Sequence, residues 1–238
     1  MKRIYLLISL FAAILLLFSC GGGGGDEEEP TPTDPSTVFD LAEFNAIYAG
    51  KSYDYYLTGK DNNGESWTMS ISSLIGAVEN IDGVEYIPEE ILLETTYDPT
   101  NETVTGTENH YYSLSGEPVY FNLSLSTGEN MECVAVTVHM LADSVLIGDT
   151  GDTTSYSCYD FYDLNKTTIK MISGTWSVEN ANDGYAYLII NTVTWNLAGY
   201  ISDTEIDVFK IDASGNIISL SITTYNADID RTVYLSTS

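Results

Sequence analysis

Basic residues are scarce in this sequence, which has eight Lys and Arg residues against 35 Asp and Glu residues and a formal net charge of −27. So acidic a chain repels polyanions, which excludes nucleic acids and anionic lipid headgroups as partners. Phosphate-cradling glycine motifs and basic patches with interleaved aromatic residues are missing too. An acidic surface that keeps the protein soluble is the simplest interpretation of this charge.

Histidine is equally rare, with only His110 and His139 in the chain, and neither lies in a recognisable motif. A hydrolytic triad and a His/Cys zinc site therefore have no candidate residues, and we expect both histidines to be ordinary strand residues. Carboxylate pairs such as Glu89 and Glu90 are numerous, so a glycoside hydrolase that uses two of them is an alternative. Because pairs this abundant arise by chance, we expect no enzyme activity, no catalytic residue and no cofactor.

Long apolar runs are absent except for residues 4–18, which follow two basic residues and precede a cysteine. The run is shorter than the roughly 20 residues that a transmembrane helix needs, and its order is that of a secretory signal. Residues 17–20, Leu-Phe-Ser-Cys, resemble the bacterial lipobox. The resemblance implies that Cys20 becomes the mature N-terminus and carries acyl chains such as palmitate, which anchor the protein to a membrane. A plain signal peptide beside a cysteine is the alternative.

Residues 20–37 contain five glycines, four consecutive acids and three prolines, and nothing in them can seed a core. This composition predicts a disordered spacer between the anchor and the folded body. Gly21, rather than Asp, follows the cysteine, which implies the outer membrane under the sorting rule of enteric bacteria. We therefore predict a lipid-anchored outer-membrane protein that faces the periplasm or the cell surface.

The folded part opens with the signature of a short helix. Asp40 and Glu43 have the spacing of a capping box, while Phe39 and Phe44 have that of a hydrophobic staple. We predict a helix over about residues 41–49 that covers an end or edge of the following sheet.

From residue 53 onward, apolar residues alternate with polar or small ones, the pattern of half-buried strands. Turn sequences such as residues 62–64 and 82–83 separate these segments, and the connections are too short for the crossovers of a parallel sheet. The sequence predicts an all-β antiparallel meander of about twelve strands. The expected core-facing residues are Tyr53, Tyr55, Leu57, Trp67, Met69, Ile71, Val119, Phe121, Leu123, Val134, Val136, Val138, Tyr187, Ile189, Asn191, Val193 and Trp195.

Two pieces of sequence recur about one hundred positions apart. Residues 78–86 match 178–187, and the Ser-Gly turn at 115–116 with its following apolar phase matches that at 214–215. The spacing indicates a tandem duplication. We predict two related halves, arranged as a sandwich or a half-barrel. The expected organisation is a signal peptide (1–19), a tether (20–37), a first β half with the helix (38–140), a connecting loop (141–152) and a second β half (153–238).

Cys133 and Cys158 are the two cysteines left once Cys20 is lipidated. In a compartment that permits disulfides we predict that they bond to each other, with two buried thiols as the alternative. Asp149 and Asp152 in the connecting loop are weak candidates for calcium ligands, but they lack EF-hand spacing, and a solvated loop is the simpler interpretation.

Taken whole, the chain resembles β-rich lipoproteins of Gram-negative bacteria that have a poly-glycine tether. The residues that carry this resemblance are the lipobox, the tether and the paired turns, and it implies an architecture without a particular activity. We expect a non-enzymatic binding or structural module of the cell envelope, anchored in the membrane by lipid, with a protein, glycan or apolar molecule as its partner. The alternative is a carrier of lipid or another apolar ligand, with an open half-barrel plugged by the helix.

Overall fold

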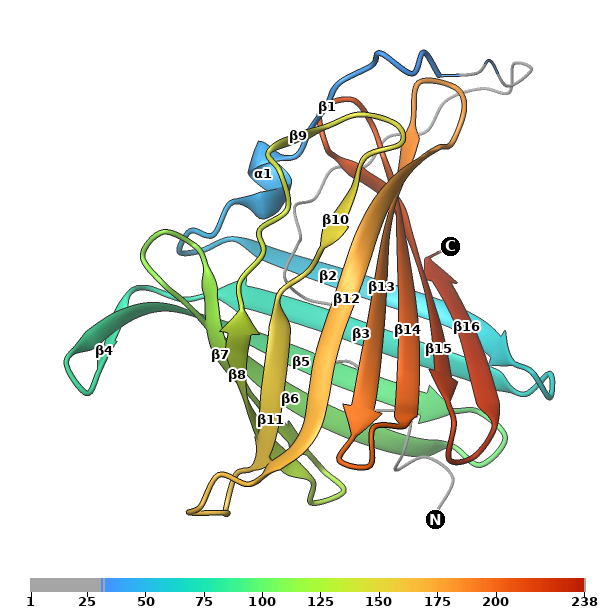
Figure 1. The fold of residues 1–238 in the computed structure, drawn as a ribbon. Helices are drawn as coiled ribbons and strands as arrows, with labels where there is room; N and C mark the ends of the chain where they lie inside the picture. Colours follow the sequence, from blue (N-terminus) through green and yellow to red (C-terminus); the bar gives the residue numbers. More distant parts are fainter. Residues whose placement is uncertain (1–30, 32, 238) are drawn as a thin grey trace.

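Twelve strands in the described part of the chain, which comprises Thr31 and residues 33–237 of the computed structural model, form one closed antiparallel barrel (Figure 1). The strands are β2 (Ser52–Asp61), β3 (Ser66–Ile75), β5 (Val84–Tyr97), β6 (Glu102–Tyr112), β7 (Pro118–Leu125), β8 (Asn130–Thr137), β11 (Ser155–Asp160), β12 (Thr168–Asn180), β13 (Ala186–Asn196), β14 (Ile201–Ile211), β15 (Ile217–Asn226) and β16 (Arg231–Thr237). The predicted all-β antiparallel fold is confirmed.

Closure of the sheet distinguishes the fold from the predicted sandwich or half-barrel. The last strand, β16, pairs with the first, β2, from Val233 opposite Asp61 to Thr237 opposite Leu57. The predicted first half supplies β2 to β8 and the second β11 to β16, and β8 pairs with β11 at the other junction. Each half therefore contributes six barrel strands, and both edge strands of one half pair with the edge strands of the other. Closure leaves no edge strand with unpaired backbone groups in the barrel. Local sequence patterns do not predict this closure, because it depends on the pairing of distant strands.

The matching turns lie in corresponding places of the barrel. The turn at residues 82–83 leads into β5 and the turn at 182–184 into β13, while Gly116 precedes β7 and Gly215 precedes β15. All of these turns use left-handed backbone, with φ of 83° at Gly116 and 78° at Gly215. β5 and β13 lie six places apart in the twelve-strand order, as do β7 and β15. The duplication itself stays a prediction.

Side chains from alternate positions fill the barrel in one apolar cluster. Among the predicted core residues, Tyr53, Leu57, Trp67, Met69, Ile71, Phe121 and Leu123 are buried. The predicted phase is wrong in two strands. In β8 the inner residues are Met131 and Cys133, and Val136 is 63% exposed. In β13 Leu188 and Ile190 point inward, while the alternate positions from Tyr187 to Trp195 are only half-buried. Both faces of β13 are apolar, so alternation cannot tell them apart; the pairing of the strands does.

The helix α1 (Ala42–Asn45) is shorter than predicted. Asp40 accepts a hydrogen bond from the backbone of Ala42 (3.0 Å), and the capping box to residue 43 is not formed. Lys51 ends the helix, because its ammonium group donates to the carbonyl oxygens of Glu43 and Ala46, both at 2.7 Å. Phe44 is buried and meets the ring of Phe209 edge-on, with 5.7 Å between centroids. The helix thus covers one end of the barrel, as predicted.

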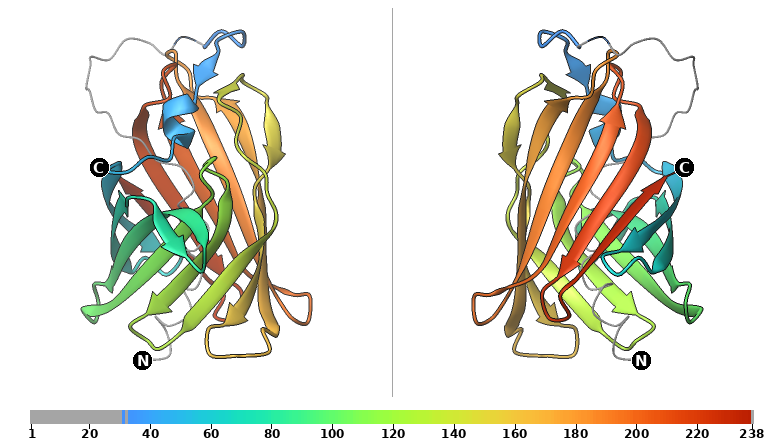
Figure 2. Two further views of the ribbon diagram at one scale, coloured as in Figure 1. Left: turned by 90° about the vertical axis from the view of Figure 1, so that its left-hand side faces the viewer. Right: turned by 90° about the vertical axis from the view of Figure 1, so that its right-hand side faces the viewer.

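Four short strands complete the fold. β1 (Phe39–Asp40) pairs with β9 (Ser144–Val145), β4 (Glu79–Ile81) forms a hairpin with β5, and β10 (Thr150–Asp152) pairs with β12. Figures 1 and 2 show α1, β1, β9 and β10 at the same end of the barrel. Within the described residues, no helix is long and apolar enough to span a bilayer.

The last residues of the predicted tether contact the barrel. Thr31 bonds twice with Asp183, which lies in the turn between β12 and β13. The backbone N–H of Asp183 donates to the carbonyl of Thr31 (2.7 Å), and the backbone N–H of Thr31 donates to the carboxylate of Asp183 (2.8 Å). Thr33 is buried, and its hydroxyl bonds the carbonyl of Tyr185 and the N–H of Gly184. Disorder predicted for the whole of 20–37 therefore does not extend to these residues. Cys20 lies outside the described part of the chain.

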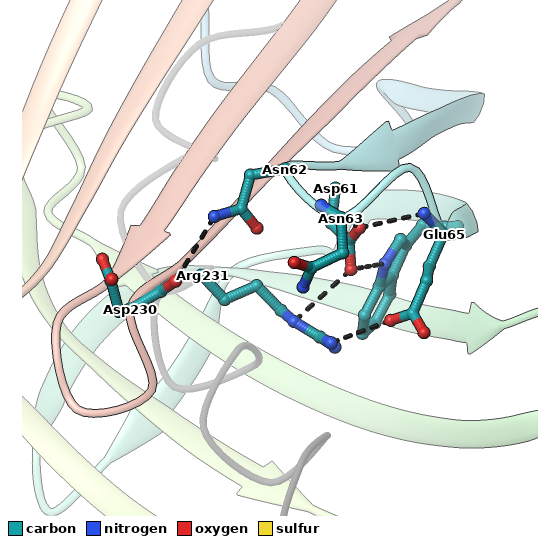
Figure 3. Close-up of polar contacts among 7 residues, drawn as sticks. Asp61, Asn62, Asn63, Glu65, Asp230 and Arg231 are labelled. Carbon is teal, nitrogen blue, oxygen red and sulfur yellow. Dashed lines mark hydrogen bonds and ion pairs between the residues drawn. The ribbon is translucent and has the colours of Figure 1, made fainter.

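The seam between β16 and β2 carries a buried ion pair (Figure 3). The Nε of Arg231 lies 3.4 Å from Oδ2 of Asp61, and its Nη2 lies 2.9 Å from Oε2 of Glu65. The indole of Trp67 donates to the same Asp61 oxygen (3.2 Å), and the guanidinium lies 5.6 Å from its ring centroid. These contacts link the first barrel hairpin to the start of the last strand.

Candidate functional site

A pocket opens beneath α1, which we call the mouth pocket. The loop between β8 and β11 and the turn between β6 and β7 form its upper walls, and inward-facing side chains of β11, β12 and β13 form its floor. It contains about 730 Å³ of space not filled by protein, part of which is open solvent, and about 50 Å³ is available to the centres of water-sized molecules. The mouth pocket is therefore small and partly open to solvent. Its lining residues are Asn45, Ile47, Tyr112, Gly116, Pro118, His139, Met140, Leu141, Asp152, Thr153, Thr154, Tyr156, Ile172, Trp176, Ile190 and Thr192.

Two buried polar atoms of these lining residues have no hydrogen-bond partner among the described residues. One is the side-chain oxygen of Asn45, at the end of α1; the other is the hydroxyl of Tyr156, in β11. The amide nitrogen of Asn45 donates to the carbonyl of Leu141 (3.0 Å) and to Asp143 (3.1 Å), and these two bonds determine the orientation of the amide. Unpartnered buried polar atoms are uncommon and costly. Both atoms have almost no accessible surface, so other atoms of their side chains line the mouth pocket.

Aromatic packing holds Tyr156 in place. Its ring meets Phe121 edge-on at 5.1 Å, and it is paired across the sheet with Ala135 of β8 and Ile172 of β12. Burial raises the pKa of Tyr156, with a smaller contribution from the nearby Glu108, so the hydroxyl stays protonated and can donate.

Tyr112, a lining residue of the mouth pocket at the end of β6, connects the pocket to a buried carboxylate. Tyr112 donates its hydroxyl hydrogen to Oε2 of Glu89 (2.6 Å). The other oxygen of Glu89 accepts from the hydroxyls of Tyr53 (3.1 Å) and Ser73. Three hydroxyl donors thus compensate the burial of this one carboxylate, which sequence reasoning had treated only as a member of an abundant pair. Its sequence neighbour Glu90 points to the outer face and is exposed, so the two acids cannot act together.

His110 lies deep in the barrel, as an inward-facing residue of β6. Its Nε2 is 2.9 Å from Oε2 of Glu108, and its ring stacks on Phe121 at 4.9 Å. Burial lowers the pKa of His110 to about 4 and raises the pKa of Glu108 well above its usual range. Burial thus favours the neutral form of both groups in this contact. The expectation of an ordinary strand residue fits His110 but not His139, which lies in the loop after β8 and lines the mouth pocket.

Glu205 and Asp207 form a second buried acidic group, on the inner face of β14. Both side chains are buried, and neither has a hydrogen-bond partner among the described residues. Burial raises the pKa of both carboxyls, and for Glu205 the charges of Asp207 and Glu108 add to the effect. Glu205 pairs across the sheet with Thr192, a pocket-lining residue, but the two acids themselves do not line the mouth pocket.

Sequence analysis did not single out these two acids, because Glu205-Ile206-Asp207 has the pattern of an outward polar face with one inward isoleucine. In the barrel the phase is reversed, and Ile206 is on the outside, 38% exposed. One local signal was present in the sequence: Phe209 has the same phase along the strand as Glu205 and Asp207. It is fully buried, on the same face as the two acids.

Cys133 and Cys158 face each other on the paired strands β8 and β11, with the sulfur atoms 2.10 Å apart. Asp149 has a local role, because its Oδ2 accepts from the backbone N–H of Leu146 (2.8 Å). Asp152 lines the mouth pocket. Within the described residues, no three His, Cys, Asp or Glu side chains converge to hold a metal ion.

Comparison of the chain with known proteins found no matching family model, no matching curated protein and no matching solved structure.

Proposed function

We propose that the protein is a non-enzymatic binding module of the bacterial cell envelope, anchored by lipid at Cys20, which holds a small and largely apolar molecule in the mouth pocket. The observation that carries this proposal is the mouth pocket itself, which is lined mainly by apolar and aromatic side chains with a few polar ones among them. Small-molecule sites generally combine an apolar wall with a few polar groups that fix orientation.

Binding is a better account of the mouth pocket than catalysis. The acids with raised pKa, which are Glu108, Asp203, Glu205 and Asp207, do not line it. Glu89 is already bonded to three hydroxyls. A general acid or base has to reach the proton it transfers. The carboxylates of this barrel are therefore poorly placed for the glycoside hydrolase chemistry considered above.

The second candidate function is that of a carrier, which binds an apolar ligand and later releases it. The position of α1 favours this function, because the helix lies over the mouth pocket as a plug would. A carrier with a large apolar cavity would line it with core-facing side chains. Of those predicted, Trp67 and Met69 are inside the barrel, whereas Tyr187, Ile189 and Trp195 are on its outer face. This small and partly open pocket suits a small molecule or the end of a larger one. A two-chain lipid would need the mouth to open.

A plug variant tests the proposal. Ile47 lines the mouth pocket from the segment after α1, and Ile47→Trp places an indole in the entrance. Val78→Trp, at the base of the β4–β5 hairpin, adds the same group to an exposed position that does not line the pocket and serves as the control. With 1-butanol as the probe, NMR titration should give saturable shifts in the native protein and in Val78→Trp, and none in Ile47→Trp. Absence of saturable binding in the native protein, or identical binding in the plugged variant, would refute the proposal.

A further inference from the structure

We infer that the end of the barrel opposite α1 is a dimer interface, which fits a second copy of this chain. Two loops form this end beside the outer face of β12 and β13: residues 161–167, between β11 and β12, and residues 197–200, between β13 and β14 (Figures 1 and 2). The inference is independent of the mouth pocket, which lies beneath α1 at the other end of the barrel.

Large apolar side chains are exposed on both loops and on the strands beside them. Leu164 in the first loop is 99% exposed, so it has no packing role within its own chain, and Tyr200 in the second loop is 72% exposed. The two loops are neighbours, because β12 pairs with β13 from Lys170 opposite Asn196 onward. The exposed residues of this surface, which we call the lower patch, are Tyr162, Leu164, Met171, Leu197, Tyr200 and Ile201.

The strand residues of the lower patch lie side by side on the outer face of the barrel. Met171 of β12 is opposite Trp195 of β13, and Trp195 is opposite Ile201 of β14. The turn that carries Leu197 and Tyr200 connects the last two of these strands directly. The row on the sheet therefore continues into the second loop without a break.

The size of the lower patch matches a protein interface. Its six residues are about two-thirds exposed on average, so at the roughly 200 Å² that a large apolar side chain can bury, they expose on the order of 800 Å². Monomers seldom expose a contiguous apolar patch above about 600 Å². A stable interface buries about 800 Å² of each partner, which is the area that the lower patch offers.

The distribution of charge favours a second copy as the partner. Residues 164–178 and 184–202, which include β13 and most of β12, contain no Asp or Glu, although the chain has 35 of them. The two charged residues of these stretches, Lys166 and Lys170, form ion pairs within their own chain. Like charges brought together across an interface oppose association, so two copies of this acidic chain can approach closely where acids are missing. A two-fold dimer joins such a patch to itself.

Thiol crosslinking in intact cells tests the inference on the full chain. Leu164→Cys and Tyr200→Cys each place a thiol in the lower patch. Leu114→Cys, in the β6–β7 turn at the mouth end, replaces a residue that is 58% exposed and serves as the control. A short bismaleimide should link at least one of the two lower-patch variants into a dimer at least fivefold more efficiently than the control. The chain without an introduced thiol gives the background.

A charge substitution identifies the surface that holds the dimer together. Leu197→Glu brings one carboxylate from each copy into the interface. It should raise the dimer dissociation constant of the purified protein at least tenfold, measured by analytical ultracentrifugation, and Leu114→Glu should leave that constant unchanged.

Three results would overturn the inference. The first is that neither lower-patch thiol links more efficiently than Leu114→Cys. The second is a dimer that is as stable in Leu197→Glu as in the native protein, which would place the interface elsewhere. The third is a chain that stays monomeric while Leu197→Glu abolishes its binding to another protein or to lipid vesicles, because the lower patch would then dock that partner.

Discussion

The buried ion pair at the β16–β2 seam gives the sharpest test of what holds the barrel closed. Arg231→Met keeps the apolar stem of the side chain and removes its charge. The guanidinium side chain is 8% exposed and the Asp61 side chain is fully buried, so the substitution leaves an uncompensated carboxylate in the interior.

The expected loss can be estimated from the contacts that remain. Removing one partner of a buried pair typically costs 3–5 kcal/mol. Asp61 keeps three donors, namely the backbone N–H groups of Asn63 (2.9 Å) and Glu65 (3.0 Å) and the indole of Trp67 (3.2 Å). These donors place the expected loss near the lower limit, about 3 kcal/mol. For a chain of this size, that lowers Tm by about 6–12 °C.

Thermal and denaturant unfolding followed by circular dichroism provide the assay, with Lys166→Met as the matched control. Lys166 pairs with Glu132 at a shorter distance, 2.6 Å, but its side chain is 57% exposed. A solvated pair contributes at most about 1 kcal/mol, so this variant should unfold within a few degrees of the native protein. Asp61→Asn combined with Arg231→Met should recover part of the loss. Equal destabilisation by the buried and the exposed substitution would refute the reasoning, because burial would then not be the cause.

Three further predictions concern acids, sulfur and lipid. Burial raises the pKa of Glu205 and Asp207 in the folded state, so the folded state binds more protons than the unfolded chain. The free energy of unfolding should therefore fall as pH rises from about 4 toward the folded pKa. The double substitution Glu205→Gln and Asp207→Asn should flatten this pH dependence, measured by urea titrations. Breaking the Cys133–Cys158 bond, which spans a separation of 25 residues, should lower the free energy of unfolding by about 3.5 kcal/mol by the chain-entropy relation. Urea unfolding with and without reductant measures this change. An unchanged unfolding midpoint would show that the bond does not stabilise the fold. Cys20→Ser should release an intact, folded barrel from the membrane fraction, and retention there would favour a transmembrane helix over a lipid anchor.

Much of the fold was readable from local patterns. Period-two alternation and the turns at residues 62–64, 82–83 and 115–116 predicted strands and hairpins, because side-chain direction and turn backbone depend on neighbouring residues. The helix was found but predicted too long, since Lys51, which bonds its last carbonyl groups, exerts its effect only after the chain folds back.

The mouth pocket could not be predicted in the same way. Asn45 and Tyr156, two of its lining residues, are far apart in the sequence and have no motif in common. The acids of β14 were likewise hidden, because Glu205 and Asp207 look like solvent-facing residues until pairing with β13 and β15 turns them inward. Register decides which face of a strand is buried, and a shift by one residue exchanges the two faces.

By itself, the sequence determined the all-β class, the positions of most hairpins, the acidic charge and the pairing candidates Cys133 and Cys158, because each of these depends on composition or on neighbouring residues. Only the tertiary structure decided that β16 closes onto β2, that carboxyls lie inside the barrel, and that α1 covers a pocket. These features arise from contacts between residues that are distant along the chain, and no local pattern records which distant strand a given strand will pair with.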